Sequence, residues 1–534
     1  MLQPIEQIQA CVLASAAEVR ALERVVIDDH GVPGIVLMTR AGRAVFERLR
    51  ARSAAVVTVF CGSGNNAGDG YVIAALAATA GIDACIVQVG DAGKLPPDAA
   101  RAHAWAGAEA VPMLAWRQDD IAIAARCNRS DVLVDALLGT GAGGAPRADY
   151  AAAIELLNAT AVTVVAVDLP SGLVADTGAA PGAAVRADET ATFIAVKPGL
   201  LTGRGPEFTG HLWLEDLDLP GAALRQHRDS SAGSGAGLAD VERVRWHAGL
   251  GLPRRRRDAH KGDSGHVLVL GGAPGMGGAA MLAAEAAMRS GAGLVSAGVA
   301  PEYAGAMLAR RPELMARGLA GCVADRDDED LAALLARASV VAVGPGLGQG
   351  VYGRRVLAGA LAARHPLVLD ADALNLLASS SFSSSLSEAA GWPPDAVLTP
   401  HPAEAARMLG VTTAEVQQDR LAAVRALVAL TGGVVVLKGA GSLVADASRV
   451  RICTDGNPGM AVGGMGDVLA GVIAALRAQG LDAFAAAVTG VCLHARAGDA
   501  AAAECGERGL LASDLLPFMR ALVNGQGVNG HLGR

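Results

Sequence analysis

The sequence predicts an α/β protein of two domains, and three observations support this prediction. At 534 residues the chain is too long for one ordinary hydrophobic core. In both halves, short apolar runs alternate with alanine-rich helical segments, which is the pattern of a parallel sheet covered by helices on both faces. Between the halves, residues 224–240 are rich in Gly, Ser and polar residues and are typical of a linker. We therefore expect domains at 1–220 and 241–534, with a linker at 221–240.

Runs rich in Val, Ile and Leu give the expected strands in chain order. In the first domain they are residues 54–60, 83–90, 130–139, 163–172 and 191–199. In the second domain the same pattern resumes at 266–272, 293–300, 339–346, 366–372, 396–402 and 433–439. The serine-rich run 379–387 has low complexity and is expected to form a surface loop.

The composition indicates which kinds of binding partner are not expected as the main one, namely nucleic acid and membrane. The net charge of -8 argues against nucleic acid as the main partner, and we interpret the one basic cluster, Arg254 to Arg257, as a solvated linker edge. The mean hydropathy is +0.35, yet the chain has no uninterrupted run of about 20 strongly apolar residues, so no membrane span is expected. The sequence leaves the oligomeric state open, a homo-oligomer included.

Cysteine usage and the start of the chain indicate the compartment. The 8 cysteines are scattered and form no CxxC pair, which favours neither a disulfide framework nor a zinc knuckle. The first residues lack a basic start followed by a long apolar core, so a signal peptide is not expected. A reducing, cytoplasmic setting fits best.

Polar residues gather where three expected strands of the first domain end. Residues 65–69 (NNAGD) follow one strand, Asp135 and the glycine-rich segment 137–146 follow another, and Asp168 and Ser171 follow a third. Ligands of open parallel sheets bind outside the carboxyl ends of the strands, so these residues are expected to share a pocket. Glycines let backbone N–H groups approach a phosphate, and oxygen ligands suit a hard cation. One such loop is also typical of a tight turn that binds nothing, but three with acids and amides are harder to explain in that way.

At these residues the chain resembles a known family. NNAGDGY, VDALLGTG and VDLPSG together resemble the NAD(P)H-hydrate epimerase domain over about residues 1–220. The resemblance implies a Rossmann-like, three-layer αβα sandwich that interconverts the R and S forms of hydrated NADH and NADPH. It implies a potassium ion bound by Asn66, Asp135 and Ser171, and Asp168 as the substrate contact for which we predict proton transfer. It also implies substrate contacts from Asn65, Asn66, Ala67, Gly68, Asp69, Gly139, Thr140, Gly141, Ala142, Gly143, Gly144 and Ala145.

One position departs from that family. Its loop usually reads NNGGDG, whereas Ala67 stands here in place of a glycine. If the position requires a positive φ, alanine costs around 1 kcal/mol or more and binding weakens, although the chemical groups remain.

A second glycine-rich stretch, GGMGD at 463–467, opens a predicted helix near the end of the chain. Backbone N–H groups at a helix start bind anions, and Asp467 could take a proton from a hydroxyl while those groups stabilise a transferring phosphoryl group. An aspartate that only caps the helix N-terminus after a glycine turn would give the same sequence pattern. Other loops at strand ends favour the functional interpretation, among them LKGAGS (437–442) and GPGLG (344–348). His401 alone would more often be structural.

The second set of motifs resembles the ribokinase-like superfamily and, more narrowly, the ADP-dependent NAD(P)H-hydrate dehydratase, over about residues 240–525. The narrower match rests on HKGDSGHVLVLGG, GMGGAAMLAAEAAMRSGAGLV, RPELM, GPGLG, LDADALNLL, TPHPAE, LKGAGS and NPGMAVGGMGDVLAG. It implies substrate contacts from Ala279, Gly346, His401 and Asp467, with Asp467 catalytic, and ADP contacts from Lys438, Gly439, Ala440, Gly441, Ser442 and Gly466. The family usually has threonine where Met465 stands, so a side-chain hydroxyl contact is lost there while the backbone N–H remains.

Together the two resemblances imply a bifunctional metabolite-repair enzyme that uses K⁺ in the first site and Mg²⁺ with ADP in the second. Two alternatives stay open. In one, the second domain is a small-molecule kinase that phosphorylates a vitamin precursor. In the other, the first domain is a non-catalytic nucleotide-binding or interaction module.

Overall fold

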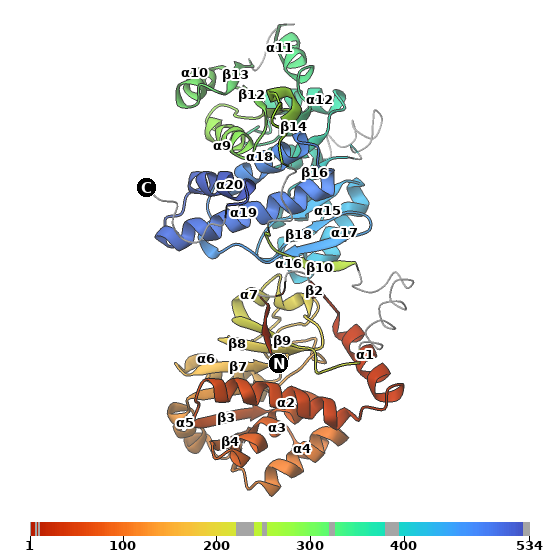
Figure 1. Ribbon diagram of the computed structural model, residues 1–534, viewed down its shortest axis with the longest axis vertical. Coiled ribbons are helices and arrows are strands. Elements are labelled where there is room, and N and C mark those ends of the chain that lie inside the picture. Colours follow the sequence, from red (N-terminus) through yellow and green to blue (C-terminus); the bar gives the residue numbers. More distant parts are fainter. Residues whose placement is uncertain are drawn as a thin grey trace. The chain divides into compact units, whose positions relative to one another are not determined.

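The computed structural model describes residues 2–5, 8, 11–220, 240–247, 254–319, 326–379, 393 and 395–526. The chain divides into two compact units, Met1–Glu242 and Arg243–Arg534, whose elements are labelled in Figure 1. Residues 221–239 of the predicted linker and 380–387 of the serine run lie outside the described residues. Arg254 to Arg257 are exposed, as expected for a solvated edge.

The first unit is built around one sheet. The strands of this sheet are β1 (Gln3–Pro4), β3 (Val56–Cys61), β4 (Asp83–Gln88), β5 (Met113–Ala115), β6 (Val132–Ala136), β7 (Thr163–Val167), β8 (Glu189–Phe193) and β9 (His211–Glu215). The short strand β2 (Cys11–Val12) is not part of this sheet. Its helices are α1 (Ala16–Asp28), α2 (Gly34–Ala51), α3 (Asn65–Thr79), α4 (Pro97–Ala108), α5 (Asp120–Arg129), α6 (Ala148–Ala159) and α7 (Gly205–Phe208), with short 3₁₀ turns η2 (Ala92–Lys94) and η3 (Pro198–Leu200).

The strand order of this sheet determines where a ligand binds. The order is β1-β9-β8-β7-β6-β3-β4-β5, and all pairs from β9 to β5 are parallel. From β3 the chain moves outward to β4, whereas from β6 it moves the other way to β7, so the order reverses between β3 and β6. A crevice at such a reversal is the usual ligand site of a doubly wound sheet.

Two apolar clusters make the first unit a three-layer sandwich, as predicted. On one face, Val57 and Val59 of β3 pack with residues of α1, α2, α3 and α4. On the other face, Phe60 of β3 packs with residues of α5 and α6. Because successive side chains of a strand point to opposite faces, the continuous apolar run of β3 fills both clusters.

The second unit holds a larger mixed sheet. Its strands are β10 (Val241–Val244), β11 (His266–Leu270), β12 (Leu294–Val299), β13 (Met315–Gly318), β14 (Val340–Val343), β15 (Leu367–Leu369), β16 (Val397–Leu398), β17 (Val434–Leu437), β18 (Ser442–Ala445) and β19 (Val450–Cys453). Its helices are α9 (Gly277–Arg289), α10 (Pro301–Arg310), α11 (Arg326–Leu335), α12 (Val351–Ala362), α13 (Asp372–Ala378), α15 (Pro402–Leu409), α16 (Thr413–Gln418), α17 (Arg420–Thr431), α18 (Met465–Ala478), α19 (Ala483–Cys505) and α20 (Leu515–Val523). Short 3₁₀ turns are η5 (Lys261–Ser264), η6 (Pro458–Met460) and η7 (Ala512–Asp514).

In this sheet the order runs β13-β12-β11-β14-β15-β16-β17-β18-β19. The strands from β13 to β17 are parallel, and β17, β18 and β19 form an antiparallel meander. One face is covered by α9, α18, α19 and α20, and the other by α11, α12 and α13. The strand order again reverses, here between β11 and β14, so a ligand site is expected at the carboxyl ends of these strands.

Among the described residues, no helix combines the length and apolar character needed to cross a bilayer. Six cysteines whose side chains the structure describes are free thiols: Cys61, Cys85, Cys127, Cys453 and Cys492, which are buried, and Cys505, which is exposed.

Candidate active sites

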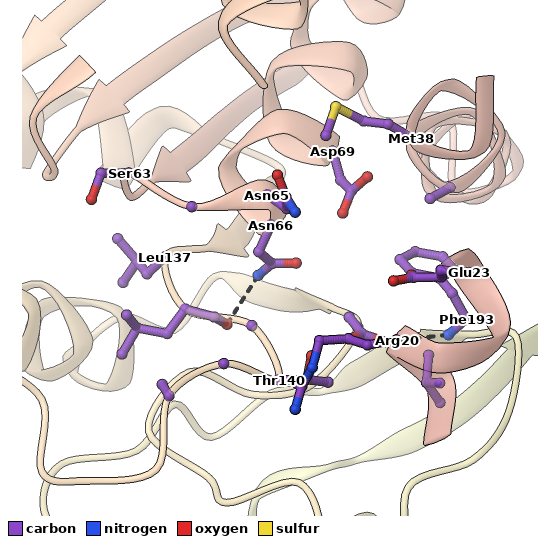
Figure 2. A pocket seen from close by; sticks show the side chains of 18 of the residues that line it. Arg20, Glu23, Met38, Ser63, Asn65, Asn66, Asp69, Leu137, Thr140 and Phe193 are labelled. Carbon is purple, nitrogen blue, oxygen red and sulfur yellow. Dashed lines mark hydrogen bonds between the residues drawn. The ribbon is translucent and has the colours of Figure 1, made fainter. Parts of the chain in front are cut away.

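A cavity of about 670 Å³ opens at the strand-order reversal of the first unit (Figure 2). Its volume lies in the usual range for small-molecule and cofactor sites. The residues that line it include ten of the predicted contacts: Asn65, Asn66, Asp69, Gly139, Thr140, Gly141, Ala142, Gly144, Ala145 and Asp168. The structure therefore brings together segments that follow three different strands.

Other predicted residues lie outside the wall of this cavity. Ala67 is fully buried in the core, and Gly68 faces Met38 and Ala99 rather than the cavity. Gly143 is also absent from the lining residues. Ala67 belongs to α3 and does not have a positive φ, so the cost we attached to alanine at this position does not arise. In a helix, alanine is the more stable choice by about 1 kcal/mol.

Asp135 and Ser171 lie behind the cavity and hold its glycine-rich wall. The Ser171 hydroxyl donates to Asp135 Oδ1 at 2.6 Å, and the Ser171 N–H donates to Asp135 Oδ2 at 2.8 Å. The N–H of Leu138 donates to Ser171 Oγ at 2.8 Å, and the Asn66 amide donates to the Leu138 carbonyl at 3.0 Å. Burial raises the pKa of Asp135 to about 6, although its hydrogen bonds with Ser171 oppose the shift.

One further observation supports a potassium ion at the predicted cation ligands. Asn66 Oδ1 is buried and has no hydrogen-bond partner within the described part of the chain. A buried, unpaired amide oxygen costs free energy that a bound cation would recover. Together with the carboxylate of Asp135 and the hydroxyl of Ser171, it provides the hard oxygen ligands that K⁺ requires.

Asp168 directly follows β7 and is paired with a buried lysine. Lys197 Nζ donates to Asp168 Oδ1, and also to the Phe193 carbonyl at 3.0 Å and Thr192 Oγ1 at 3.1 Å. The Lys197 side chain is only 1% exposed, so this ion pair is shielded from water. Asp168 has φ 66, a strained conformation for a non-glycine residue that typically persists at functional sites.

Two further carboxyl groups, which the sequence analysis did not combine, face the same cavity. Asp69 comes from α3 and Glu23 from α1, and both line the cavity. Burial raises the pKa of Glu23, and the negative charge of Asp168 adds to this shift. Burial raises the pKa of Asp69 well above its ordinary range, with further contributions from Asp168 and Glu23. Lys197 opposes both shifts without cancelling them.

In the second unit, Lys438 forms the centre of the candidate site. It follows β17, and its Nζ lies 2.6 Å from Asp370 Oδ1 and 3.9 Å from Glu404 Oε2. A Cβ added at Gly466 would lie 3.1 Å from Lys438 Nζ, so the start of α18 touches this cation directly. Burial lowers the pKa of Lys438, but the charges of Asp370 and Glu404 outweigh it, and the pKa ends above its ordinary value. Lys438 therefore stays charged.

Asp467 lies in the first turn of α18, as predicted, and its environment suits a general base. Burial raises its pKa to about 7, and the nearby negative charge of Asp370 adds to the shift while Lys438 opposes it. Asp372 and Glu404 contribute in the same direction as Asp370. A carboxyl group with a pKa near neutrality exchanges protons efficiently at physiological pH.

His401 caps the N-terminus of α15 and is not free to turn. Its Nδ1 accepts from the N–H groups of Ala403 at 3.0 Å and Glu404 at 3.4 Å, while Glu404 accepts from the His401 N–H at 2.8 Å. Burial lowers the pKa of His401, and the charges of Lys438 and Arg407 act in the same direction. The ring is therefore neutral, with its proton on Nε2 as a donor.

The remaining predicted residues fall around this centre. Gly346 follows β14, and a Cβ added there would lie 3.1 Å from Ala279 Cβ, so these two predicted substrate contacts are neighbours. Gly439, Ala440 and Gly441 lie in the turn from β17 into β18, which begins at Ser442, and Ser442 Oγ donates to the Gly439 carbonyl at 2.8 Å. Met465 is the first residue of α18, and its side chain packs in the core.

Several residues of these sites were not singled out from the sequence. Glu23 and Lys197 belong to the first site, and Asp370 and Glu404 to the second. Arg420 supports the second site, because its buried guanidinium donates to the Leu437 and Lys438 carbonyls at 3.1 Å each. Asp370 and Glu404 stand within LDADALNLL and TPHPAE, so those motifs carried a signal; Arg420 lies in a separate helix with no local signal.

Comparisons with known proteins agree on both halves. A family model described as NAD(P)H-hydrate dehydratase matches residues 267–519, and one described as YjeF-related protein N-terminus matches residues 34–199. The bifunctional NAD(P)H-hydrate repair enzyme Nnr of Coxiella burnetii is 43% identical over 517 residues, covering 96% of this chain and 99% of the relative. The enzyme of the same description from Escherichia coli is 41% identical over 516 residues, covering 95% and 93%.

Among solved structures, an ADP/ATP-dependent NAD(P)H-hydrate dehydratase from Bacillus subtilis, co-crystallized with ATP/Mg²⁺, is 29% identical. It covers 52% of this chain and 96% of its own, with a TM-score of 0.46.

Proposed function

The chain belongs to the family of bifunctional NAD(P)H-hydrate repair enzymes, and from this premise we propose how its two sites divide the work. The first unit interconverts the R and S forms of hydrated NADH and NADPH. The second unit dehydrates the S form at the expense of ADP and releases AMP and phosphate. This assignment, rather than the small-molecule kinase alternative, agrees with relatives that match nearly the whole chain.

The observation that carries the dehydratase assignment is the juxtaposition of Asp467, Lys438 and the start of α18. In the hydrate, the hydroxyl group lies on a ring carbon bonded to the ring nitrogen. Asp467 accepts the hydroxyl proton, and the oxygen attacks the β-phosphoryl group of ADP, so that AMP leaves. Lys438 and the N–H groups of the helix start stabilise the charge on the phosphoryl group in transfer.

The phosphorylated hydrate then loses phosphate. The lone pair of the ring nitrogen expels it, the neighbouring carbon loses a proton, and the reduced ring is restored. Phosphate leaves far more readily than hydroxide, which explains why the reaction consumes a nucleotide. His401 is fixed by its capping hydrogen bonds, and its Nε2 lies 3.3 Å from Glu404 Oε1, so we expect these two side chains to contact the substrate together.

Mg²⁺ and K⁺ fit the residues present. The excess of carboxylates around Asp467, namely Asp370, Asp372 and Glu404, favours a divalent cation, which would offset the negative charge of the nucleotide. In the first unit, Asn66, Asp135 and Ser171 would hold K⁺, which would neutralise the buried Asp135. The free thiols of the described cysteines support a reducing, cytoplasmic setting.

The test is recovery of NADH from a mixture of R and S hydrates with Mg²⁺, K⁺ and either ADP or ATP. We expect complete, nucleotide-dependent recovery that is faster than spontaneous epimerisation permits. Recovery that stalls once the S form is consumed would refute the epimerase assignment alone. A stable phosphorylated product without NADH would refute the dehydratase assignment and favour a kinase.

A further inference from the structure

The carboxyl groups that line the first cavity do not share one environment, and this difference separates their chemistry. Asp168 is held by the buried ammonium group of Lys197. Glu23 and Asp69 line the same cavity, and neither side-chain carboxyl group makes a hydrogen bond within the part of the chain that the structure describes. Figure 2 shows Asp69 and Asn66 extending from α3 towards the part of the cavity where α1 carries Glu23 and Arg20.

The position of Glu23 is fixed by the helix that carries it. Val19, Arg20, Glu23 and Ile27 of α1 all line the cavity, a spacing that belongs to one helix face. The helix is anchored at its start, where Ser15 and Glu18 form a capping box and Asp176 accepts from the Ala16 N–H at 2.7 Å. Val19, Leu22 and Val26 pack into the core. Glu23 is therefore presented to the cavity by a rigid element.

A second feature shows that the wall of this cavity leaves polar atoms free to bind a ligand, here the oxygen that we assign to K⁺. Asn66 is 7% exposed, lines the same cavity, and carries the unpaired Oδ1 described above. Polar groups that converge on a cavity without partners of their own are the usual sign of a binding site.

We propose that Glu23 is a proton-transfer group of the epimerase. It donates a proton to the ring hydroxyl, and Asp168 accepts a proton from the water that adds to the ring. This inference rests on the epimerase function proposed above. Glu23 protonates the hydroxyl, the C–O bond breaks with release of water, and the lone pair of the ring nitrogen forms a C=N⁺ bond. Water then adds to the same carbon from the other face and gives a proton to Asp168. The reverse epimerisation exchanges the two roles, and atoms and charge balance in each direction.

The environment of each group fits its role. Burial and the negative charge of Asp168 raise the pKa of Glu23, which keeps it protonated to higher pH than an ordinary glutamate. Asp69 is less suited to give up its proton, because burial raises its pKa still further above the ordinary range. Lys197 donates a hydrogen bond to Asp168 Oδ1 and fixes the position of this side chain at the cavity wall. Two carboxyl groups in unequal environments are a common arrangement for acid–base chemistry.

The experiment uses the full chain and the R hydrate with K⁺ but without nucleotide, so that only epimerisation is observed. Glu23→Gln removes the transferable proton while preserving the size of the side chain. We expect it to lower kcat by about 10²- to 10⁴-fold with little change in KM. Glu23→Asp should retain part of the activity. Glu155→Gln, an exposed glutamate on α6, is the matched control and should behave as wild type.

A second measurement does not depend on any variant. In ¹⁸O-labelled water, the wild-type chain should incorporate one solvent oxygen for each inversion, because the C–O bond breaks each time. Inversion without oxygen exchange would overturn the proposed step, and so would Glu23→Gln epimerising within about threefold of wild type. ADP-dependent dehydration of the S hydrate should be unchanged in Glu23→Gln, which shows that the variant is folded. A wild-type chain that does not accelerate inversion would instead refute the epimerase function itself.

Discussion

Replacing Asp467 by asparagine should abolish nucleotide-dependent dehydration and at the same time stabilise the folded second unit. A general base contributes about 10²- to 10⁴-fold to rate, so we expect kcat for the S hydrate to fall by that factor, about 3–5 kcal/mol of transition-state stabilisation. Epimerisation should be unaffected, because all residues of the first cavity belong to the first unit.

The gain in stability follows from the pKa of Asp467, which burial raises from 3.8 to about 7. Above pH 7 the folded state carries an ionised carboxylate that it disfavours, and asparagine removes that cost. A difference of about 3 pH units corresponds to at most about 4 kcal/mol. Since the folded pKa lies above the unfolded one, the cost is absent below about pH 4, grows as the pH rises, and is complete above about pH 7.

Wild-type activity should report the same pKa. As pH falls through about 7, Asp467 becomes protonated and can no longer act as a base, so kcat/KM should fall about tenfold between about pH 8 and pH 6. Burial and the charges of Lys438 and Arg407 lower the pKa of His401, which moves its protonation to lower pH than that of an ordinary histidine. Asp372→Asn removes one negative charge near Asp467 and should move the acid limb to lower pH.

The assay follows NADH formation from the purified S hydrate with ADP and Mg²⁺, alongside denaturant unfolding of both variants at about pH 8 and about pH 5. The reasoning is refuted if Asp467→Asn keeps more than about one tenth of wild-type activity. It is equally refuted if the variant is less stable than wild type at the higher pH.

Three further substitutions test packing and ligand support. Gly68→Ala would place a Cβ 2.5 Å from Met38 Sδ and should destabilise the first unit by about 1–3 kcal/mol in denaturant unfolding. Gly471→Ala would place a Cβ 2.0 Å from the backbone carbonyl oxygen of Ala283, which cannot move as a side chain does, so a larger loss of stability is expected in the second unit. Ser171→Ala removes a hydrogen-bond donor from a buried carboxylate and should slow epimerisation and abolish its response to K⁺, measured as rate against K⁺ concentration.

Matched glycine controls separate local crowding from a general effect of alanine. Gly107 in α4 and Gly305 in α10 have no atom within 4 Å of an added Cβ. Both are helical, so alanine there should be neutral or stabilising by up to about 1 kcal/mol. If either control destabilises the chain as much as its partner substitution, the crowding explanation is wrong.

Local sequence predicted most of the framework because the buried strands carry a strong local pattern. The run before residue 61 is apolar except for Thr58, and it forms β3 with both faces covered. The antiparallel strands β18 and β19 escaped prediction, since each has only four residues and follows a short turn, glycine-rich before β18 and polar before β19. Residues 168–172 were counted with a strand but form the turn after β7, because Asp168 leaves the extended conformation.

The candidate sites were predictable where a motif carries its own chemistry, as at Asn65–Asp69 and Asp467. Glu23 could not be found in this way, because it lies on a different helix and reaches the cavity only through the packing of α1. Asp370 lies inside the LDADALNLL motif, but the motif does not reveal its ion pair with Lys438, which is 68 residues away in the chain. Conversely, Ala67 and Gly68 stand inside a motif but face the core, which spacing alone does not reveal.

Each cavity or cluster described above draws all its residues from one of the two compact units, within a single polypeptide. Translation therefore delivers the two activities in strict one-to-one copy number, whatever the expression level. An isomerase alone only brings two epimers to equilibrium. A step that consumes ADP converts one of them irreversibly and so pulls the equilibrium towards repair. Under the proposed function, every cell that makes the epimerase domain also makes the dehydratase domain, because they are one polypeptide. The R hydrate is therefore always converted in the presence of the enzyme that consumes the S hydrate.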